Sequence, residues 1–331
     1  MLPIPNNYWS HAEVLASWIE LSALARDGGF VARGAVLDSF KDSGLGNAGD
    51  SATPGSPQAM ITDTWLVLGR RSRILGPAWP FVLTADTLTR KDGYHAMADV
   101  AAYTAMLLID AAGSKWYDQL ALAPGDPGRT YFESIVTASL RRLCGGRTSR
   151  FGAPFPADWP TDFPGRVKRL AEEFGIKARE GDITDFASDA QQDGSLDVVS
   201  RVRLGDEEGG SAYLLVQCAT GAEWNSNKKG EPMMSLWGNF IQWDGPRLRA
   251  VAVPYSLREK KELARASTML DAVILDRLRL ACGEPDKGLD EPFRMMLAKW
   301  CKEKLSDCRG KTKKPSAHSR GKAKRGRKAA R

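Results

Sequence analysis

Two short runs of branched and apolar residues in the second half of the chain constrain the fold most. Leu196–Val202 and Ala212–Ala219 are bounded by Gly, Asp and Glu, which is typical of β-strands. The turn between them, around Gly205 to Gly210, is short enough for an antiparallel hairpin. A third run of this kind covers Arg249–Tyr255. The second half of the chain is therefore predicted to contain a β-sheet.

Helical patterns surround these strands. Tyr131–Leu143 repeats apolar residues at helical spacing, and Val167–Phe174 is a second helix that Gly175 can end. A Pro- and Gly-rich insertion, Gly145–Pro164, separates them, and Leu257–Ala281 is predicted to be one long amphipathic helix. This order favours an α/β fold in which a mixed central sheet is flanked by helices.

The first half has a different composition and carries no catalytic signature. Residues 1–122 are predicted to form a mainly helical domain, in which Ser10 and Glu13 form a capping box. The Ala-Pro-Gly-Asp-Pro-Gly segment at residues 123–128 marks a boundary. A second domain then covers residues 129–305, followed by a basic tail at 309–331.

The net charge of +7 is concentrated in that tail. Residues 309–331 hold eleven Lys and Arg and no Asp or Glu, which leaves 36 basic and 40 acidic residues elsewhere. Such a segment has too little apolar surface to fold, and its charge suits a nucleic-acid backbone. A merely solubilising extension is the alternative. The candidate nucleic-acid-binding residues are Lys311, Lys313, Lys314, Lys322, Lys324, Arg325, Arg327 and Lys328.

Other features narrow the class of protein. No stretch of the sequence is apolar for long enough to span a membrane, and the N-terminus lacks a secretory signal, so we expect a cytoplasmic protein. The five cysteines form no Cys-x-x-Cys pair and are expected to be reduced. Tryptophans 224, 237 and 243 are expected to pack in the core more readily than to stack on bases.

Two polar residues interrupt the predicted strands. An ionised Asp197 is costly among apolar neighbours unless it is paired or binds a metal, and Gln217 interrupts Leu214-Leu215-Val216 in the same way. If the strands are neighbours, both side chains can project to one point. Oxygen ligands of this kind suit Mg²⁺, which can activate water for attack on a phosphodiester.

Asp193-Gly194-Ser195-Leu196-Asp197, followed by Leu215-Val216-Gln217-Cys218, resembles the Mrr-type branch of the PD-(D/E)xK nuclease superfamily. Phe132-Glu133 is similar to the helical Phe-Glu of that branch, and the likeness covers about residues 130–255. The resemblance implies a restriction-endonuclease-like core. It also implies that Asp197 is the principal metal ligand and Gln217 the second, with the Cys218 backbone carbonyl completing the set and Glu133 assisting.

One departure from the family pattern concerns a lysine. The pattern places lysine two residues after the glutamine, where this chain has Ala219. Some branches supply the lysine from the helix that follows, so Lys228 is predicted to replace it, with Lys229 as the alternative.

Three hypotheses follow for the function. The first is an endonuclease dependent on Mg²⁺ (or Mn²⁺) that cleaves DNA, with RNA as an alternative substrate; the resemblance implies a role in prokaryotic restriction or anti-phage defence. The second is a catalytically inactive, nuclease-like DNA-binding or scaffolding subunit, for which Ala219 is the best argument. In the third, the N-terminal domain docks a partner such as an ATPase or helicase, and activity requires that complex. The oligomeric state stays open.

Overall fold

A computed structural model describes most of the chain. The described residues are 1–5, 11–43, 56–91, 100–155, 158–179, 183, 194–205, 210–221, 224, 234–257 and 260–310. Among the helices in these ranges, none combines the length and apolar character that a membrane span requires.

The first half is mainly helical, as the sequence predicts, but it also contains a small antiparallel sheet in the order β1-β3-β2. Its elements are α1 (Ala12–Ala25), β1 (Phe30–Ala32), α2 (Arg33–Asp42), α3 (Pro57–Leu75), η1 (Gly76–Ala78), β2 (Phe81–Leu83), β3 (Thr87–Arg90), α4 (Ala101–Gly113) and η4 (Asp118–Leu120). Its strands have three or four residues each. Runs this short give little periodicity for a prediction.

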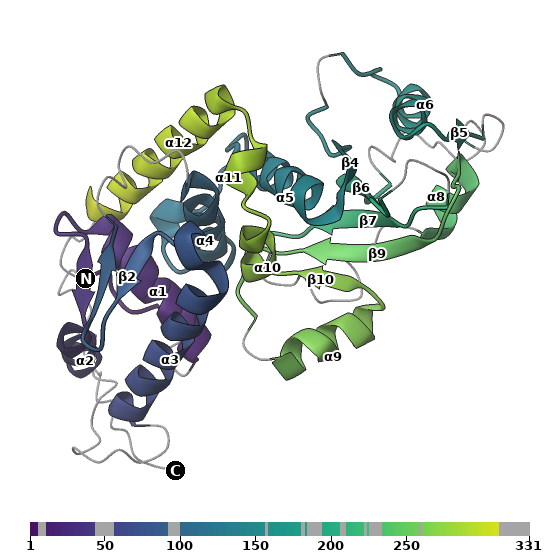
Figure 1. Cartoon of the computed structure of the whole chain (residues 1–331). Helices are drawn as coiled ribbons and strands as arrows, with labels where there is room; N and C mark the ends of the chain where they lie inside the picture. Colours follow the sequence, from purple (N-terminus) through teal and green to yellow (C-terminus); the bar gives the residue numbers. More distant parts are fainter. Residues whose placement is uncertain are drawn as a thin grey trace, which may run out of the picture.

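The second half contains a mixed five-stranded sheet in the order β10-β9-β7-β6-β4 (Figure 1). Its elements are α5 (Gly128–Cys144), β4 (Gly145–Arg150), α6 (Phe163–Phe174), β5 (Lys177–Ala178), β6 (Val198–Val202), β7 (Tyr213–Cys218), α8 (Met234–Phe240), β8 (Ile241–Gln242), β9 (Arg247–Ala252), α9 (Lys260–Leu270), β10 (Val273–Leu275), α10 (Arg277–Cys282), α11 (Pro285–Gly288) and α12 (Glu291–Gly310). Strands β4, β6 and β7 pair antiparallel, and β7, β9 and β10 pair parallel.

Side-chain alternation along the strands separates two apolar layers. Val198 and Val216 belong to the core that includes Ile135 and Leu140 of α5. Their strand neighbours Val199 and Leu215 lie in a second core with residues of α6 and α8. Because successive strand residues point to opposite faces, this sheet is covered by helices on both sides. The predicted α/β class with a mixed sheet flanked by helices is thereby confirmed.

The prediction of one helix over Leu257–Ala281 is wrong. The segment forms α9, then strand β10, then α10. Asp271 has a φ of 45°, which ends the helical path, and Val273 pairs in parallel with Ala250 of β9. Asp276 then caps α10 by accepting a hydrogen bond from the Arg279 amide at 3.0 Å. The apolar residues of β10 fall at helical spacing, so the sequence pattern did not distinguish this three-residue strand from a helix.

The predicted insertion Gly145–Pro164 also contains an edge strand. Residues Gly145–Arg150 form β4, which pairs with β6 from Gly145↔Val202 to Arg150↔Val198. Gly, Arg, Thr and Ser do not show the branched apolar pattern of a strand. The pairing therefore comes from long-range contacts.

The two halves of the chain share one continuous apolar core. It joins residues of α1, α3 and α4 to residues of α5, the sheet and α12. In Figure 1, α12 returns to lie along the N-terminal helices, where it packs against α4 and α1. The domain boundary at residues 123–128 stays a prediction, since the core continues across it.

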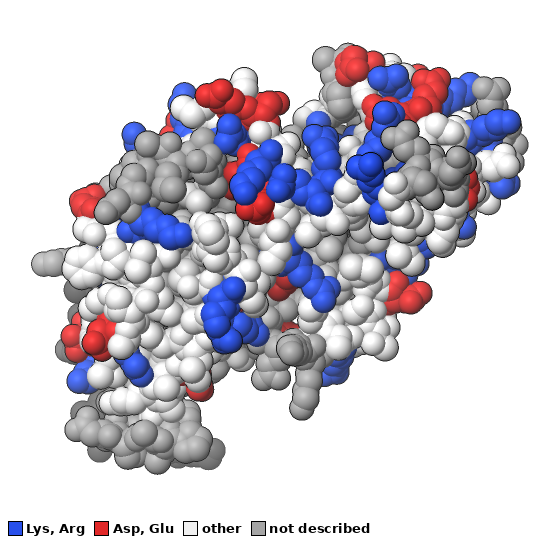
Figure 2. All heavy atoms as spheres, viewed as in Figure 1, with Lys and Arg blue, Asp and Glu red and all other residues white. Residues whose placement is uncertain are grey.

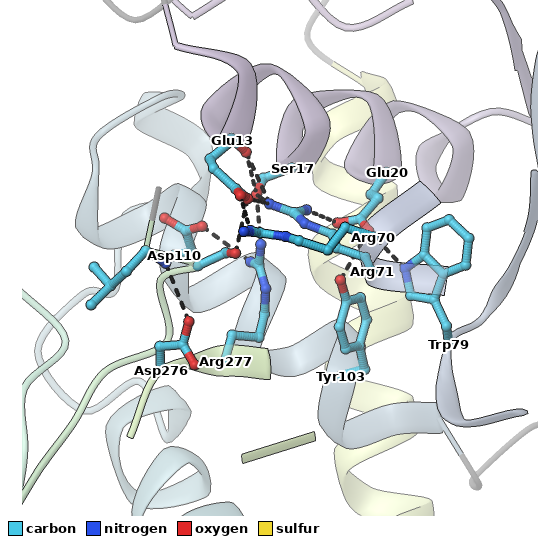
Figure 3. Close-up of polar contacts among 12 residues, drawn as sticks. Glu13, Ser17, Glu20, Arg70, Arg71, Trp79, Tyr103, Asp110, Asp276 and Arg277 are labelled. Carbon is cyan, nitrogen blue, oxygen red and sulfur yellow. Dashed lines mark hydrogen bonds and ion pairs between the residues drawn. The ribbon is translucent and has the colours of Figure 1, made fainter. Parts of the chain in front are cut away.

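A network of buried charges lies beneath α1, and Arg71 of α3 is its centre (Figure 3). The Arg71 side chain is fully buried and donates to Glu20 Oε2 at 2.6 Å and to Glu13 Oε2 at 2.7 Å. Burial lowers the pKa of Arg71, but Glu20 and Glu13 raise it overall above its usual value. Arg71 therefore stays charged. The Glu13 side chain is committed to this network, where it also pairs with Arg70, and His11 is the N-cap residue of α1. The predicted capping box is thus not borne out at Glu13, while Ser10 lies outside the described residues.

Arg277 extends this network into the second half of the chain. From α10, it donates to Asp110 Oδ2 of α4 at 3.1 Å and to Ser17 Oγ of α1 at 2.5 Å (Figure 3). Burial raises the pKa of Asp110, and Arg277 opposes that rise. Arg277 itself is fully buried, so its charge serves this network and not the solvent.

We predict that Arg71→Ala lowers the free energy of unfolding by about 3–5 kcal/mol, because it removes the buried cation that contacts both Glu20 and Glu13 and leaves Glu13 with Arg70 alone. Arg73→Ala is the matched control, since Arg73 lies on the same helix but is exposed. Its effect should stay within about 0.5 kcal/mol. Urea unfolding followed by circular dichroism measures both. Equal effects of the two substitutions would contradict the structural role of the network.

Candidate functional site

Strands β6 and β7 bring the two predicted ligand positions together. They form the expected antiparallel pair, with Val198 opposite Val216 and Val199 opposite Leu215. Asp197 directly precedes β6, and its backbone N–H donates to the Val216 carbonyl at 3.0 Å. Continuing this register by one residue places Asp197 opposite Gln217. The backbone arrangement is therefore the one that the sequence predicts.

The Asp197 side chain is held by the end of β7. Its Oδ2 accepts a hydrogen bond from the Cys218 backbone N–H at 2.6 Å. The Asp197 carbonyl accepts from the backbone N–H groups of Phe151 and Gly152, at 2.7 and 3.1 Å. A short hydrogen bond from a backbone amide favours the ionised carboxylate. These contacts fix the carboxylate where the ends of three strands meet.

Glu133 reaches the same place from helix α5. It lies in the second turn of the helix and is 9% exposed. A methyl group at Gly152 would lie 2.5 Å from Glu133 Oε2 and 3.0 Å from Asp197 Oδ1. Both carboxylate oxygens therefore lie within 3.0 Å of one point. Glycine at position 152 leaves that point free of a side chain.

Arg150 brings a positive charge to this pair of carboxylates, a role that sequence reasoning missed. Its Nη1 lies 3.2 Å from Glu133 Oε2 and also donates to the Gly152 carbonyl at 3.3 Å. Arg150 is the last residue of β4, paired with Val198. No sequence signal identified it, because β4 itself was not predicted.

Gln217 has an oxygen that its surroundings do not satisfy. Among the described residues, no hydrogen-bond donor reaches the buried Gln217 Oε1. A buried polar atom in this state costs about 1–3 kcal/mol. A water molecule or a bound ion can supply the missing partner of such an atom.

Cys218 contributes to the site through its backbone. Desolvation raises the pKa of the Cys218 thiol well above its usual value, and the charges of Asp197 and Glu133 raise it further. The thiol therefore stays protonated at neutral pH, which disfavours a nucleophilic thiolate. The predicted contribution of the Cys218 carbonyl stays a prediction.

Other predicted site residues have different outcomes. Ala219, where the family pattern has lysine, packs beside an apolar cluster that includes Val251 and Val253. Lys228 and Lys229 lie outside the described residues, as do Asp193 and the tail residues 311–331. Trp237 is fully buried and donates to the Gly194 carbonyl at 3.1 Å, so it packs as expected.

The donor set can be tested against Mg²⁺. Within the described ranges, no three His, Cys, Asp or Glu side chains are grouped closely enough to hold a metal ion. Mg²⁺ needs fewer protein ligands, since one or two carboxylates and several waters complete its shell. Glu133 and Asp197 supply two carboxylates, and Gln217 supplies an unsatisfied amide oxygen, which are oxygen ligands of the kind that Mg²⁺ prefers. The nearby Arg150 guanidinium opposes it in charge.

We predict that iodoacetamide at pH 8 leaves Cys218 of the folded protein unmodified, because its raised pKa keeps the thiol protonated. Cys282 is the internal reference: burial raises its pKa less than that of Cys218, and its side chain is exposed, so it should be modified first. Peptide mass spectrometry measures both, and denaturation before labelling should remove the difference. Modification of Cys218 as fast as that of Cys282 in the folded protein would contradict this description of the thiol.

No family model, no curated protein and no solved structure matches this chain.

Proposed function

We propose that this protein is a nuclease dependent on Mg²⁺ or Mn²⁺ that hydrolyses phosphodiester bonds of DNA. One observation carries the proposal: the Glu133 and Asp197 oxygens lie within 3.0 Å of one point beside Gly152. Two carboxylates at such a separation repel each other unless a cation or a proton lies between or beside them. The resemblance of Asp193–Asp197 and Leu215–Cys218 to an Mrr-type nuclease supports the same proposal.

Each residue has a role in this proposal. A divalent ion at the site would supply an activated water and offset the charge that develops on the phosphate. Asp197 and Gln217 would hold that ion through oxygen atoms, and Glu133 would assist from α5. The Cys218 amide keeps the Asp197 carboxylate in place through its 2.6 Å hydrogen bond. Lys228 would orient the attacking water, in place of the lysine that position 219 lacks.

The wider fold supports this proposal as well. The mixed sheet flanked by helices is compatible with a restriction-endonuclease-like core. The basic tail would raise affinity for DNA without reading its sequence. A role in restriction or anti-phage defence is part of the proposal through the resemblance alone.

A second candidate function is a catalytically inactive DNA-binding subunit. The specific observation in its favour is the ion pair between Arg150 and Glu133, at 3.2 Å. Arg150 already offsets part of the negative charge that would otherwise attract a metal ion. If the Arg150 guanidinium permanently replaces a metal ion, and if no lysine replaces Ala219, the site has no catalytic activity.

A cleavage assay on plasmid DNA with Mg²⁺ or Mn²⁺ separates the two candidates. The wild type is expected to cleave, and Asp197→Ala should lower the rate by about 10²–10³-fold, because a metal ligand is worth several kcal/mol in the transition state. Lys228→Ala should also lower it, and Lys229→Ala should affect it less. Asp118→Ala is the control, since Asp118 is an exposed acid of η4 and belongs neither to α5 nor to the sheet that carries the site.

Two results would contradict the proposal. Cleavage that survives Asp197→Ala at the level of Asp118→Ala would remove Asp197 from the mechanism. A wild type that binds DNA but fails to cleave it with either metal would favour the inactive subunit. The assay should be repeated with the products of neighbouring genes, since a partner ATPase or helicase is the third hypothesis.

A further inference from the structure

Five arginines surround a groove at the edge of the sheet, away from Asp197. Two adjoining hollows share Gly146, Arg147, Glu172 and Glu173. Their walls include Arg141 of α5, Arg147 of β4, Arg169 of α6, Arg201 of β6 and Arg203 just after it. We call these five residues the arginine groove. In Figure 2, Lys and Arg gather over α5 and β4, beside the acidic atoms of α6.

Composition does not account for this concentration of charge. Outside residues 309–331 the chain has more acidic than basic residues, yet the groove has five arginines against Glu172 and Glu173. Arg169 approaches Asp158, Glu172 and Glu173 only at 3.9–4.0 Å, with 42% of its side chain exposed. Exposed pairs at such distances contribute little to stability. The arginines that line the two hollows therefore outnumber the glutamates there by five to two.

A register shift in the edge strand shapes the groove. The pairing of β4 with β6 is irregular between Gly145 and Thr148. A side chain at Gly146 would lie 2.2 Å from the Arg201 carbonyl, so glycine is required there. Such irregularities redirect the side chains beside them. Here Arg147 turns toward α6, where it donates to the Glu173 carbonyl.

The geometry points to a phosphodiester backbone as the ligand. We infer that the arginine groove binds phosphates of the nucleic acid on which the proposed nuclease acts. One guanidinium group can donate two parallel hydrogen bonds to the oxygens of one phosphate, and all five cations here are arginines. The identification of the ligand as a nucleic acid rests on the proposed function. The groove and its positive charge are observed independently of that function.

The groove and the candidate site lie along the same strand, β4, so one ligand strand could contact both. Arg147 precedes Arg150 by three residues on β4, which corresponds to about 10 Å along a strand. Arg150 contacts Glu133 of the candidate site. A nucleic-acid strand that follows β4 would therefore contact the groove and the candidate site within a few nucleotides of each other.

Binding without metal tests this inference separately from cleavage. Fluorescence anisotropy with labelled single-stranded DNA, duplex DNA and RNA, in EDTA, compares the full-length wild type with Arg141→Gln/Arg203→Gln. Both arginines are exposed, so the substitutions should not disturb folding, which a thermal melt checks. The control is Arg73→Gln/Arg265→Gln, which removes two exposed arginines outside the groove.

The groove variant should bind at least one of these nucleic acids about tenfold or more weakly at 0.1 M salt, with the slope of log K against log salt reduced by about 1–2. The control variant should bind like the wild type. All proteins keep the basic tail, so its contribution is the same in each. Equal affinity and slope in the groove variant and the control would overturn the inference, as would a wild type that binds none of the three nucleic acids. Cleavage by the Asp197→Ala variant would count against the proposed function alone.

Discussion

The antiparallel pairing of β6 with β7 determines where the candidate site residues lie. It sets Asp197 opposite the Gln217 position and brings the Cys218 amide within 2.6 Å of the Asp197 carboxylate. The pairing of β4 with β6 then adds Gly152 and Arg150, and packing of α5 on the sheet adds Glu133. A shift of one residue in the β6–β7 register would turn each side chain to the opposite face. The chemistry of the site therefore depends on the hydrophobic contacts, such as Val199 with Leu215, that hold this register.

Buried charge is treated differently in the two halves of the molecule. In the network around Arg71, Glu13 and Glu20 are paired with a buried guanidinium, and Arg277 ties that network to Asp110. This arrangement compensates the charges that it buries and connects α10 to α1 and α4. Around Asp197, two carboxylates approach one point, one arginine pairs with Glu133, and Gln217 Oε1 lacks a donor among the described residues. The network around Arg71 is suited to holding helices together. The residues around Asp197 are suited to binding a ligand.

Apolar periodicity and turn residues in the sequence correctly predicted several helices and strands of the second half. The structure confirms the strands near Leu196 and Ala212, the helix over Tyr131–Leu143 and the helix end at Gly175. These elements were predictable because the spacing of apolar residues and the Gly residues at their ends define them. The helix over Leu257–Ala281 was wrong because a three-residue strand fits within helical apolar spacing. Arg150 and Gly152 were missed because their roles come from β4, whose polar sequence becomes a strand only through its pairing with β6. Lys228, Lys229 and the tail lie outside the described residues, so their roles stay predictions.

The central claim is that Glu133, Asp197 and Gln217 serve one divalent cation. Anomalous diffraction from crystals of the protein soaked in Mn²⁺ tests it most directly, because Mn²⁺ prefers the same oxygen ligands as Mg²⁺ and scatters anomalously. We predict a single strong peak within about 2.5 Å of an Asp197 oxygen and Gln217 Oε1, with Glu133 beside it. An empty site at millimolar Mn²⁺, with Arg150 still paired to Glu133 and the Gln217 amide turned into the core, would contradict the account.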